Sequence, residues 1–212
     1  MILTLDIGNT NIKTALFEGM EMRQYWRIST NRARSSDEYG IILMGLLNRN
    51  GIPASAVDGI IMSSVVPQIN FTIEHMCRNY FGHEPMKIEP GVKTGINIKY
   101  ENPREVGSDR IANAVAAYEL YGGPCITIDF GTATTFGAIS ERGEFLGGAI
   151  CPGLKLAAEA LTERAAKLPR FELAKPETVI GRNTITNMQS GIVYGYIGQV
   201  NYLVERMKRE LG

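Results

Sequence analysis

The stretch LTLDIGNTN, residues 3–11, predicts a buried strand that ends abruptly in small polar residues. Its apolar residues alternate with Thr4 and Asp6, and this period of two is typical of a strand. Gly8 and its neighbour tolerate a tight turn, and the chain returns as a second apolar-rich run over residues 12–17. The fold is therefore expected to begin with a hairpin that carries an aspartate where its first strand ends.

Asp6 lies beside a turn whose backbone N–H groups can face an anion, because successive N–H groups form a concavity that suits phosphate. A carboxylate at this place would repel phosphate unless a metal cation lay between them. We therefore interpret Asp6 as a ligand of a metal cation, through water, and residues 8–11 as contacts of phosphate oxygens. The alternative is an ordinary hairpin with an aspartate at its end, since short motifs match by chance.

The same pattern recurs at residues 126–133, ITIDFGTA. Both copies continue into a second and a third run, separated by a Glu/Gly turn. The matched positions are Thr4 with Thr127, Asp6 with Asp129 and Gly8 with Gly131. Two copies of one supersecondary unit suggest duplicated domains. We expect the two Asp-Gly turns to face each other across a cleft and to hold a polyphosphate from both sides.

Composition narrows the classes of function. The chain has 212 residues, 44% hydrophobic and 21% charged, with zero net charge. This balance gives no support for binding to nucleic acid or to an anionic membrane, and no apolar run approaches the roughly 18 residues of a membrane-spanning helix. Cys77, Cys125 and Cys151 are far apart and only two histidines are present, so we expect reduced core cysteines of a cytoplasmic protein and no zinc site.

The first half of the chain predicts a ribonuclease-H-like α/β unit. A third strand over residues 21–28 follows the hairpin, and a helix begins after Ser35 or Ser36. A continuous β-branched run over residues 59–66 predicts a strand buried on both faces. Pro67 fits the first turn of the next helix, and a short strand follows over residues 86–89.

The second half predicts another copy of this unit. Ser108 is a plausible N-cap of a helix that bridges the two domains, and the repeated strands follow it. Pro152 is expected to open a helix, and residues 186–211 are expected to form a long one. We predict two ribonuclease-H-like domains of the actin-like ATPase class in tandem, residues 1–106 and residues 107–212. The second copy is expected to be incomplete at the C-terminus, by one strand and one helix.

Asp109 is the carboxylate that most invites a chemical role. It lies in the first turn of a helix, where the helix dipole favours acids by about 0.3–1 kcal/mol, and this structural effect accounts for most aspartates at helix starts. The functional interpretation is a general base that takes a hydroxyl proton during phosphate transfer, as kinases commonly use aspartate. Arg110 could hold a carboxylate or a phosphate, or it could be a solvated surface charge.

Several ordered motifs resemble one known family. They are Asp6-Ile7-Gly8-Asn9-Thr10, Asn102-Pro103-x-Glu105-Val106-Gly107-Ser108-Asp109-Arg110, Asp129-Phe130-Gly131-Thr132-Ala133-Thr134-Thr135-Phe136, Gly147-Gly148-Ala149-Ile150-x-Pro152-Gly153, Leu168-Pro169, Gly181-x-x-Thr184 and Ser190-Gly191-x-x-Tyr194-Gly195. Together these motifs span nearly the whole chain and resemble type III pantothenate kinase.

The resemblance implies a fold of the acetate and sugar kinase, Hsp70 and actin superfamily. It also implies ATP-dependent phosphorylation of pantothenate, the first step of coenzyme A synthesis, by a cytoplasmic homodimer. Magnesium would accompany ATP, and potassium or ammonium would bind at Asp129. Thr184 of one subunit would reach the other subunit's site.

The resemblance assigns the remaining roles residue by residue, with Asp109 as the base. The nucleotide contacts would be Asp6, Ile7, Gly8, Asn9, Thr10, Asn11, Ile12, Lys13 and Thr132. The pantothenate contacts would be Tyr100, Gly107, Ser108, Asp109, Arg110 and Thr184.

Five of these residues also have a purely structural interpretation. Asp129 could satisfy turn amides, Thr132 could be strand filler, and Tyr100 could be a half-buried loop aromatic. Thr184 could be a helix N-cap, and Lys13 a solvated strand lysine.

Two other functions compete with the kinase. One is a metal-dependent nuclease on the same scaffold, with Asp6, Asp109 and Asp129 binding two metal ions, which the neutral charge disfavours. The other is a non-catalytic relative that acts as a regulatory or interaction protein.

Overall fold

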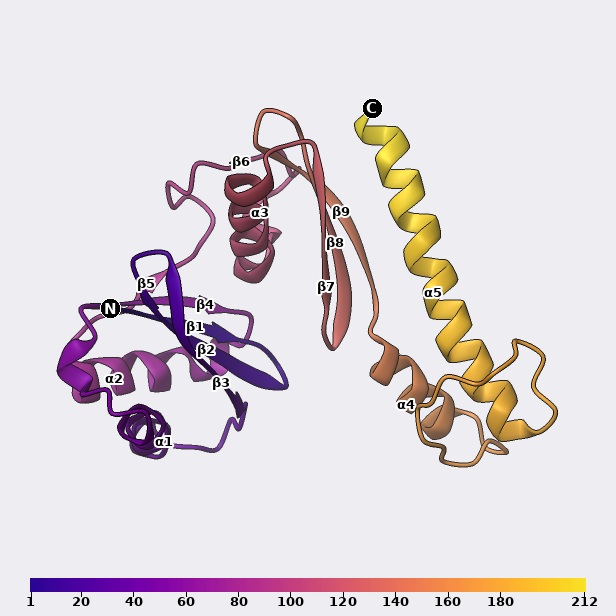
Figure 1. Cartoon of the computed structure of the whole chain (residues 1–212), viewed down its shortest axis with the longest axis horizontal. Coiled ribbons are helices and arrows are strands. Elements are labelled where there is room, and N and C mark those ends of the chain that lie inside the picture. Colours follow the sequence, from indigo (N-terminus) through magenta and orange to yellow (C-terminus); the bar gives the residue numbers. More distant parts are fainter. The chain divides into compact units, whose positions relative to one another are not determined.

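The computed structural model describes residues 1–212 and divides the chain into two compact units (Figure 1). The first unit comprises residues 1–94 and 102–112, and the second comprises residues 95–101 and 113–212. Each unit contains one β-sheet. The mixed α/β class with two sheets is therefore as predicted.

The first sheet has five strands in the order β3-β2-β1-β4-β5. Their bounds are β1 Ile2–Ile7, β2 Asn11–Glu18, β3 Glu21–Ser29, β4 Gly59–Ser64 and β5 Met86–Lys87. The first three strands form an antiparallel meander, whereas β4 pairs parallel with β1 and β5 pairs parallel with β4. This is the ribonuclease-H-like order that the sequence predicts, and it places the carboxyl ends of β1 and β4 side by side.

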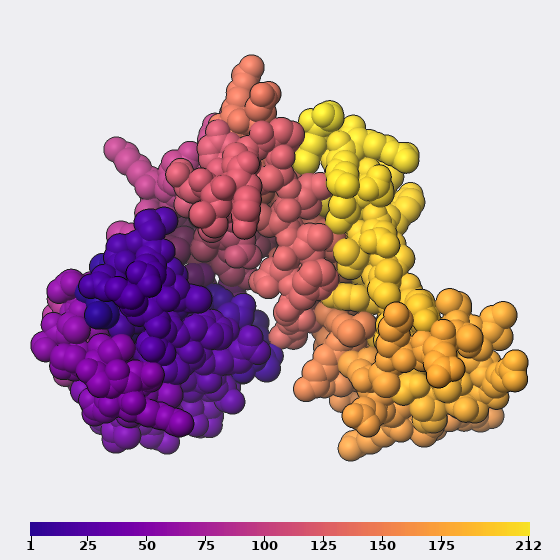
Figure 2. Space-filling model, viewed as in Figure 1, coloured from indigo at the N-terminus to yellow at the C-terminus, as the bar shows by residue number.

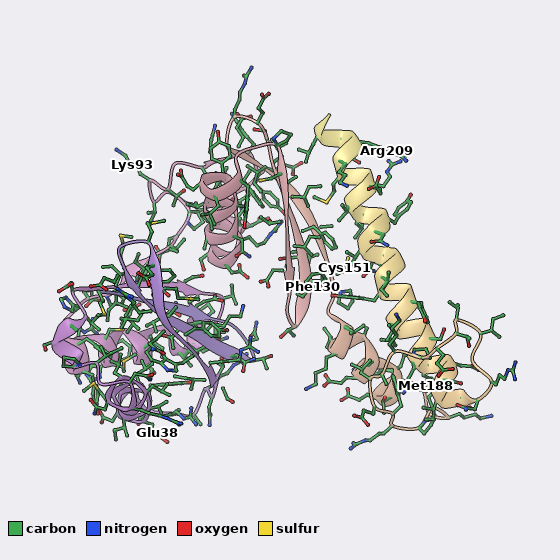
Figure 3. The ribbon with its side chains drawn as sticks, in the orientation of Figure 1. Glu38, Lys93, Phe130, Cys151, Met188 and Arg209 are labelled. Carbon is green, nitrogen blue, oxygen red and sulfur yellow. The ribbon has the colours of Figure 1, made fainter.

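Two helices, α1 Ser36–Arg49 and α2 Asn70–Phe81, lie together on one face of this sheet (Figure 1). Helix α1 begins with a complete capping box, in which Ser35 and Glu38 satisfy each other's backbone N–H groups. Figure 3 labels Glu38 on this helix. Pro67 lies in the first turn of the next helix, as predicted. It is the first residue of the short 3₁₀ helix η2 Pro67–Ile69, which leads directly into α2.

The core of the first unit fills the space between these helices and the sheet. It lies beneath the surface atoms that Figure 2 draws from indigo to purple. Its fully buried members include Leu3, Tyr39, Leu47, Met62 and Met76, and each large apolar side chain contributes about 1.5–3 kcal/mol on burial. This core fixes the sheet from which the first turn projects. The 3₁₀ helices η1 Ala54–Ala56 and η3 Pro103–Glu105 lie outside it.

The second sheet has four strands in the order β6-β9-β8-β7. Their bounds are β6 Asn97–Ile98, β7 Cys125–Phe130, β8 Ala133–Ile139 and β9 Glu144–Pro152. The last three form an antiparallel meander like that of the first unit, and β6 pairs parallel with β9.

Three helices complete the fold. Helix α3 Ser108–Tyr121 begins in the first unit and ends in the second, and α4 Leu154–Arg164 and α5 Thr184–Leu211 belong to the second unit. Pro152 does not open α4 as expected, because it is the last residue of β9 and Gly153 is the N-cap. Helix α5 contacts the strands through Tyr196, whose hydroxyl bonds Thr134 and whose ring meets Phe130, a residue at the end of β7 (Figure 3).

The cysteines follow the sequence prediction only in part. Cys77 is fully buried on α2, and its burial raises the pKa of its thiol to about 12. Cys125 and Cys151 are free thiols that lie at the first residue of β7 and near the end of β9, and both are partly exposed. No helix of the chain is both long and apolar enough to cross a membrane.

Candidate active site

The first Asp-Gly turn is closed by its own backbone. The Gly8 N–H donates to the Asn11 carbonyl at 3.0 Å, and a Cβ on Gly8 would lie 3.0 Å from the same oxygen. Glycine therefore lets the chain reverse tightly here. Asn9 and Thr10 are exposed at the tip of the turn, where a ligand can reach them.

Thr30, just beyond β3, fastens this turn to the rest of the first unit. Its hydroxyl donates to the Gly8 carbonyl at 2.6 Å, and its N–H donates to the Thr10 carbonyl at 3.0 Å. The turn is thus held from outside as well as from within, so its tip has a fixed shape before any ligand arrives. Arg32 follows closely and donates to the Asn9 side chain at 3.3 Å.

Asp6 has a cationic partner on the neighbouring strand. It lies directly opposite Lys13 in the β1–β2 register, and the Lys13 ammonium is 3.3 Å from the Asp6 carboxylate. Both side chains are about two-fifths exposed, 42% for Lys13 and 39% for Asp6, so water screens the pair and its contribution to stability is small. Lys13 is therefore a partly exposed lysine of β2, as in the structural interpretation, and it also forms an ion pair with Asp6.

The second Asp-Gly turn repeats the first with one residue fewer. The Gly131 N–H donates to the Ala133 carbonyl at 3.0 Å. Because the loop is shorter, Asp129 lies opposite Thr135, and no lysine occupies the position that Lys13 holds in the first copy. The two aspartates therefore occupy different electrostatic surroundings despite their matching sequences.

Gly153 packs against the back of the second turn. Its N–H donates to the Thr132 carbonyl at 2.9 Å, and a Cβ would lie 2.2 Å from the Gly131 carbonyl and 2.6 Å from that of Thr132. The carbonyl oxygens of Gly131 and Thr132, two and three residues after Asp129 in the chain, thus both lie close to Gly153. Oxygen ligands of this kind are those that replace the hydration shell of potassium in proteins.

Ser108 is not the N-cap that the sequence predicts, because it is the first residue of α3 and its hydroxyl bonds strand β4. Ser63 donates its hydroxyl hydrogen to Ser108 Oγ at 3.0 Å, and the Ser64 N–H donates to the same atom at 2.9 Å. Since Ser63 pairs with Asp6 in the β1–β4 register, these bonds bring the start of α3 to the carboxyl ends of β1 and β4. The structure therefore places Asp6 and Asp109 at the same end of the first sheet.

Asp109 is partly exposed in the first turn of α3, and its Oδ1 accepts the Arg110 N–H at 2.8 Å. Gly107 lies directly beneath this carboxylate, since a Cβ on Gly107 would be 2.5 Å from Asp109 Oδ1 and 3.7 Å from Val65. The absence of a side chain at residue 107 therefore makes room for the observed rotamer of Asp109.

If Asp109 acts as the general base that the sequence predicts, Gly107→Ala is expected to lower turnover by about tenfold while leaving the free energy of unfolding within about 1 kcal/mol. The added methyl forces the flexible Asp109 carboxylate to rotate, and misplacement by about 1 Å can cost up to 10²-fold in rate. Steady-state kinetics with urea denaturation checks this. The matched control is Gly45→Ala, because a Cβ at Gly45 in α1 meets nothing within 4 Å. Unchanged turnover in Gly107→Ala would contradict the packing argument.

The remaining predicted residues are spread over both units. Arg110 is buried, 8% exposed, so it is not a solvated surface charge. Tyr100 lies in the second unit, where its ring faces Phe145 with the centroids 6.5 Å apart. Thr184 is the exposed first residue of α5, and Asn183, not Thr184, is the N-cap.

Comparison with known proteins supplies the family. The model of the type III pantothenate kinase family matches residues 2–206. The chain belongs to the type III pantothenate kinase family. This pantothenate kinase catalyses the ATP-dependent phosphorylation of pantothenate, the first step of coenzyme A biosynthesis.

Solved structures agree with the fold of the kinase. It resembles a protein described as a conserved Baf family transcriptional activator from Campylobacter jejuni, with 19% identity, a TM-score of 0.58, and 95% of this chain and 78% of that chain covered. It also matches a protein described as a 2-dehydro-3-deoxygalactonokinase from Sinorhizobium meliloti, with 12% identity, a TM-score of 0.45, and 79% and 57% covered. At 19% identity the likeness to the first of these proteins shows the fold alone. The predicted mixed α/β fold with two sheets is confirmed.

The sequence did not predict the residues that hold the first Asp-Gly turn and the start of α3 in place. Thr30 bonds the turn, and Ser63 and Ser64 bond Ser108 beside Asp109. These hydrogen bonds join distant parts of the chain, so no local motif indicates them. A usable signal existed for the two serines, because small polar residues end an otherwise apolar strand at Ser63-Ser64, next to β1.

Proposed function

We propose that Asp109 is the general base of this pantothenate kinase. The supporting observation is its position, since α3 begins against the carboxyl end of β4, beside the strand that carries Asp6. Asp109 takes the proton of the pantothenate 4′-hydroxyl while that oxygen attacks the γ-phosphorus of ATP. The bond from the γ-phosphorus to the bridging oxygen breaks, and ADP leaves. Positioned general bases contribute about 10²–10⁴-fold to the rate.

The nucleotide phosphates are assigned to the first turn, over residues 6–13. Asn9 and Thr10 are exposed at its tip, and Thr30 keeps the tip in shape. Donors fixed in advance stabilise charge on a transferring phosphoryl group without reorganisation. Thr132, exposed in the second turn, is proposed as a further ATP contact.

We assign the two metal ions to the two aspartates. Magnesium binds proteins through one or two carboxylates, water and substrate phosphates, and Asp6 supplies such a carboxylate, already balanced by Lys13. Potassium or ammonium is assigned to Asp129, which pairs with Thr135 where Asp6 pairs with Lys13, and which is followed within three residues by the Gly131 and Thr132 carbonyls. When bound, the two cations would supply positive charge that offsets the negative charge of the phosphate groups.

Pantothenate contacts are proposed for Tyr100, Gly107, the side chains of Asp109 and Arg110, and Thr184, whereas Ser108 can offer only its backbone because its hydroxyl bonds β4. Arg110, buried at the start of α3, offers a guanidinium of the kind that binds carboxylates, and pantothenate carries one. Thr184 is exposed at the start of α5, as the proposed homodimer requires, in which it contacts pantothenate of the other subunit. Sedimentation equilibrium distinguishes this dimer from a monomer.

The three free thiols support a cytoplasmic location, and fractionation of cells tests it.

Pantothenate-dependent formation of ADP tests the proposed function most directly. We expect the purified chain to release ADP from magnesium ATP only when pantothenate is present, and to do so at least several-fold faster in potassium or ammonium than in sodium. A coupled assay measures this, and Asp129→Asn is expected to remove the response to the cation. ADP release that ignores pantothenate would contradict the assignment. Magnesium-dependent cleavage of a labelled oligonucleotide would instead support the nuclease alternative.

A further inference from the structure

The hydroxyl of Ser108 uses its whole hydrogen-bonding capacity on strand β4. A serine hydroxyl has one donor hydrogen and two acceptor lone pairs. Ser108 Oγ accepts from the Ser63 hydroxyl at 3.0 Å and from the Ser64 N–H at 2.9 Å, and it donates to the Ser64 carbonyl at 3.1 Å. We call Ser63, Ser64 and Ser108 the serine clasp. No bond of this hydroxyl remains for a ligand unless one clasp bond breaks.

The β4 side of the clasp is itself anchored. The Ser64 hydroxyl donates to the Asn70 side chain at 2.6 Å at the start of α2, and it accepts the Val66 N–H at 3.2 Å. Ser63 and Ser108 are 5% and 7% exposed, so water competes little for these bonds. Polar networks that are buried and fully satisfied fix one arrangement of the elements they join. The clasp therefore fixes the first residue of α3 against a strand that is rigid at this point.

We propose that Ser108 is a positioning residue for Asp109, acting through Ser63 and Ser64, and that its side chain is not a ligand of pantothenate. This inference rests on the proposed role of Asp109 as the base. Asp109 directly follows Ser108, so a displacement of the first turn of α3 moves its carboxylate by a similar amount. Small displacements of a reacting group are costly, about 10²-fold for roughly 1 Å.

The experiment compares Ser108→Ala with wild type in two backgrounds. We expect kcat to fall about tenfold while the KM for pantothenate stays within about twofold, because the substrate loses no contact. In the Asp109→Asn background, adding Ser108→Ala is expected to leave residual turnover unchanged, because the serine acts only through the base. A rise in the KM for pantothenate at constant kcat would overturn the proposal, as would an equal fall of kcat in both backgrounds.

Ser63→Ala provides a second route if Ser108→Ala folds poorly. It removes one clasp bond, so we expect a smaller fall in kcat in the same direction, and the double variant should be no slower than Ser108→Ala alone. The matched control is Ser36→Ala. Ser36 is also the first residue of a helix, and its hydroxyl lies 3.1 Å from the His75 ring on α2, but it has no link to Asp109. A fall in kcat of equal size in Ser36→Ala would overturn the proposal.

Hydrogen exchange separates failure of this inference from failure of the proposed function. Faster exchange is expected in Ser108→Ala for the Ser64 N–H, which loses its acceptor, and for the first bonded amides of α3, Arg110 and Ile111. Unchanged exchange would overturn the clasp whatever the activity. An inactive wild-type chain would refute the proposed function and with it the catalytic part of the inference, whereas exchange would still report on the clasp.

Discussion

Asp109→Asn is expected to lower kcat by about 10²-fold or more while the chain stays folded. The asparagine amide has nearly the same size and can still accept the Arg110 N–H, which Asp109 Oδ1 accepts at 2.8 Å. It cannot take a proton from the pantothenate hydroxyl, and a positioned base contributes about 10²–10⁴-fold. Steady-state kinetics, with circular dichroism to confirm folding, measures the effect.

Asp37→Asn is the matched control, because Asp37 occupies in α1 the position that Asp109 occupies in α3. Both are the second residue of their helix and both lie in its first turn. Each substitution removes about 0.3–1 kcal/mol of interaction with the helix dipole, so both variants should lose similar, small amounts of stability. Only Asp109→Asn should lose turnover. Turnover close to wild type in Asp109→Asn would show that Asp109 takes no part in the reaction. Its interaction with the helix dipole would then be sufficient to explain an aspartate in the first turn of α3.

The strands and hairpins around the two aspartates could be predicted because their signals are local. Alternation of apolar and polar residues gives β1, and glycine with small polar residues gives the turn after it. The match of Asp6 with Asp129 was also visible. The sequence could not show that the second turn is one residue shorter, because the register of β7 with β8 is decided by pairing across the sheet.

The partners of the site residues could not be predicted, because they come from distant parts of the chain. Serine is a residue type that N-caps favour, but the Ser108 hydroxyl does not cap the helix. It bonds Ser63 and Ser64 instead, which are 45 and 44 residues away in the chain. Arg110 follows two polar residues and resembles a surface charge, but packing buries it. Local propensity is a weak prior that tertiary contacts override. That the two Asp-Gly turns face each other across a cleft stays a prediction.

The second sheet is expected to be most sensitive at Gly148, where β8 and β9 approach closely. A Cβ on Gly148 would lie 1.8 Å from the Phe136 carbonyl oxygen and 2.7 Å from its carbon, both backbone atoms of β8. Unlike a flexible side chain, this backbone cannot move aside without disturbing the β8–β9 ladder, in which Gly148 pairs with Gly137. Gly148→Ala is therefore expected to cost about 3 kcal/mol, at the upper end of overpacking.

Urea denaturation, monitored with two spectroscopic probes, shows which of the two units is destabilised by Gly148→Ala. Trp26, the single tryptophan, lies on β3 and reports on the first unit, whereas circular dichroism reports on both. We expect the dichroism midpoint to fall in Gly148→Ala while the Trp26 transition stays near its wild-type position. The control is Gly198→Ala on α5, where a Cβ meets nothing within 4 Å, so alanine should stabilise the helix by about 0.5–1 kcal/mol. A Gly148→Ala variant as stable as wild type would show that β8 and β9 are farther apart than the structure places them.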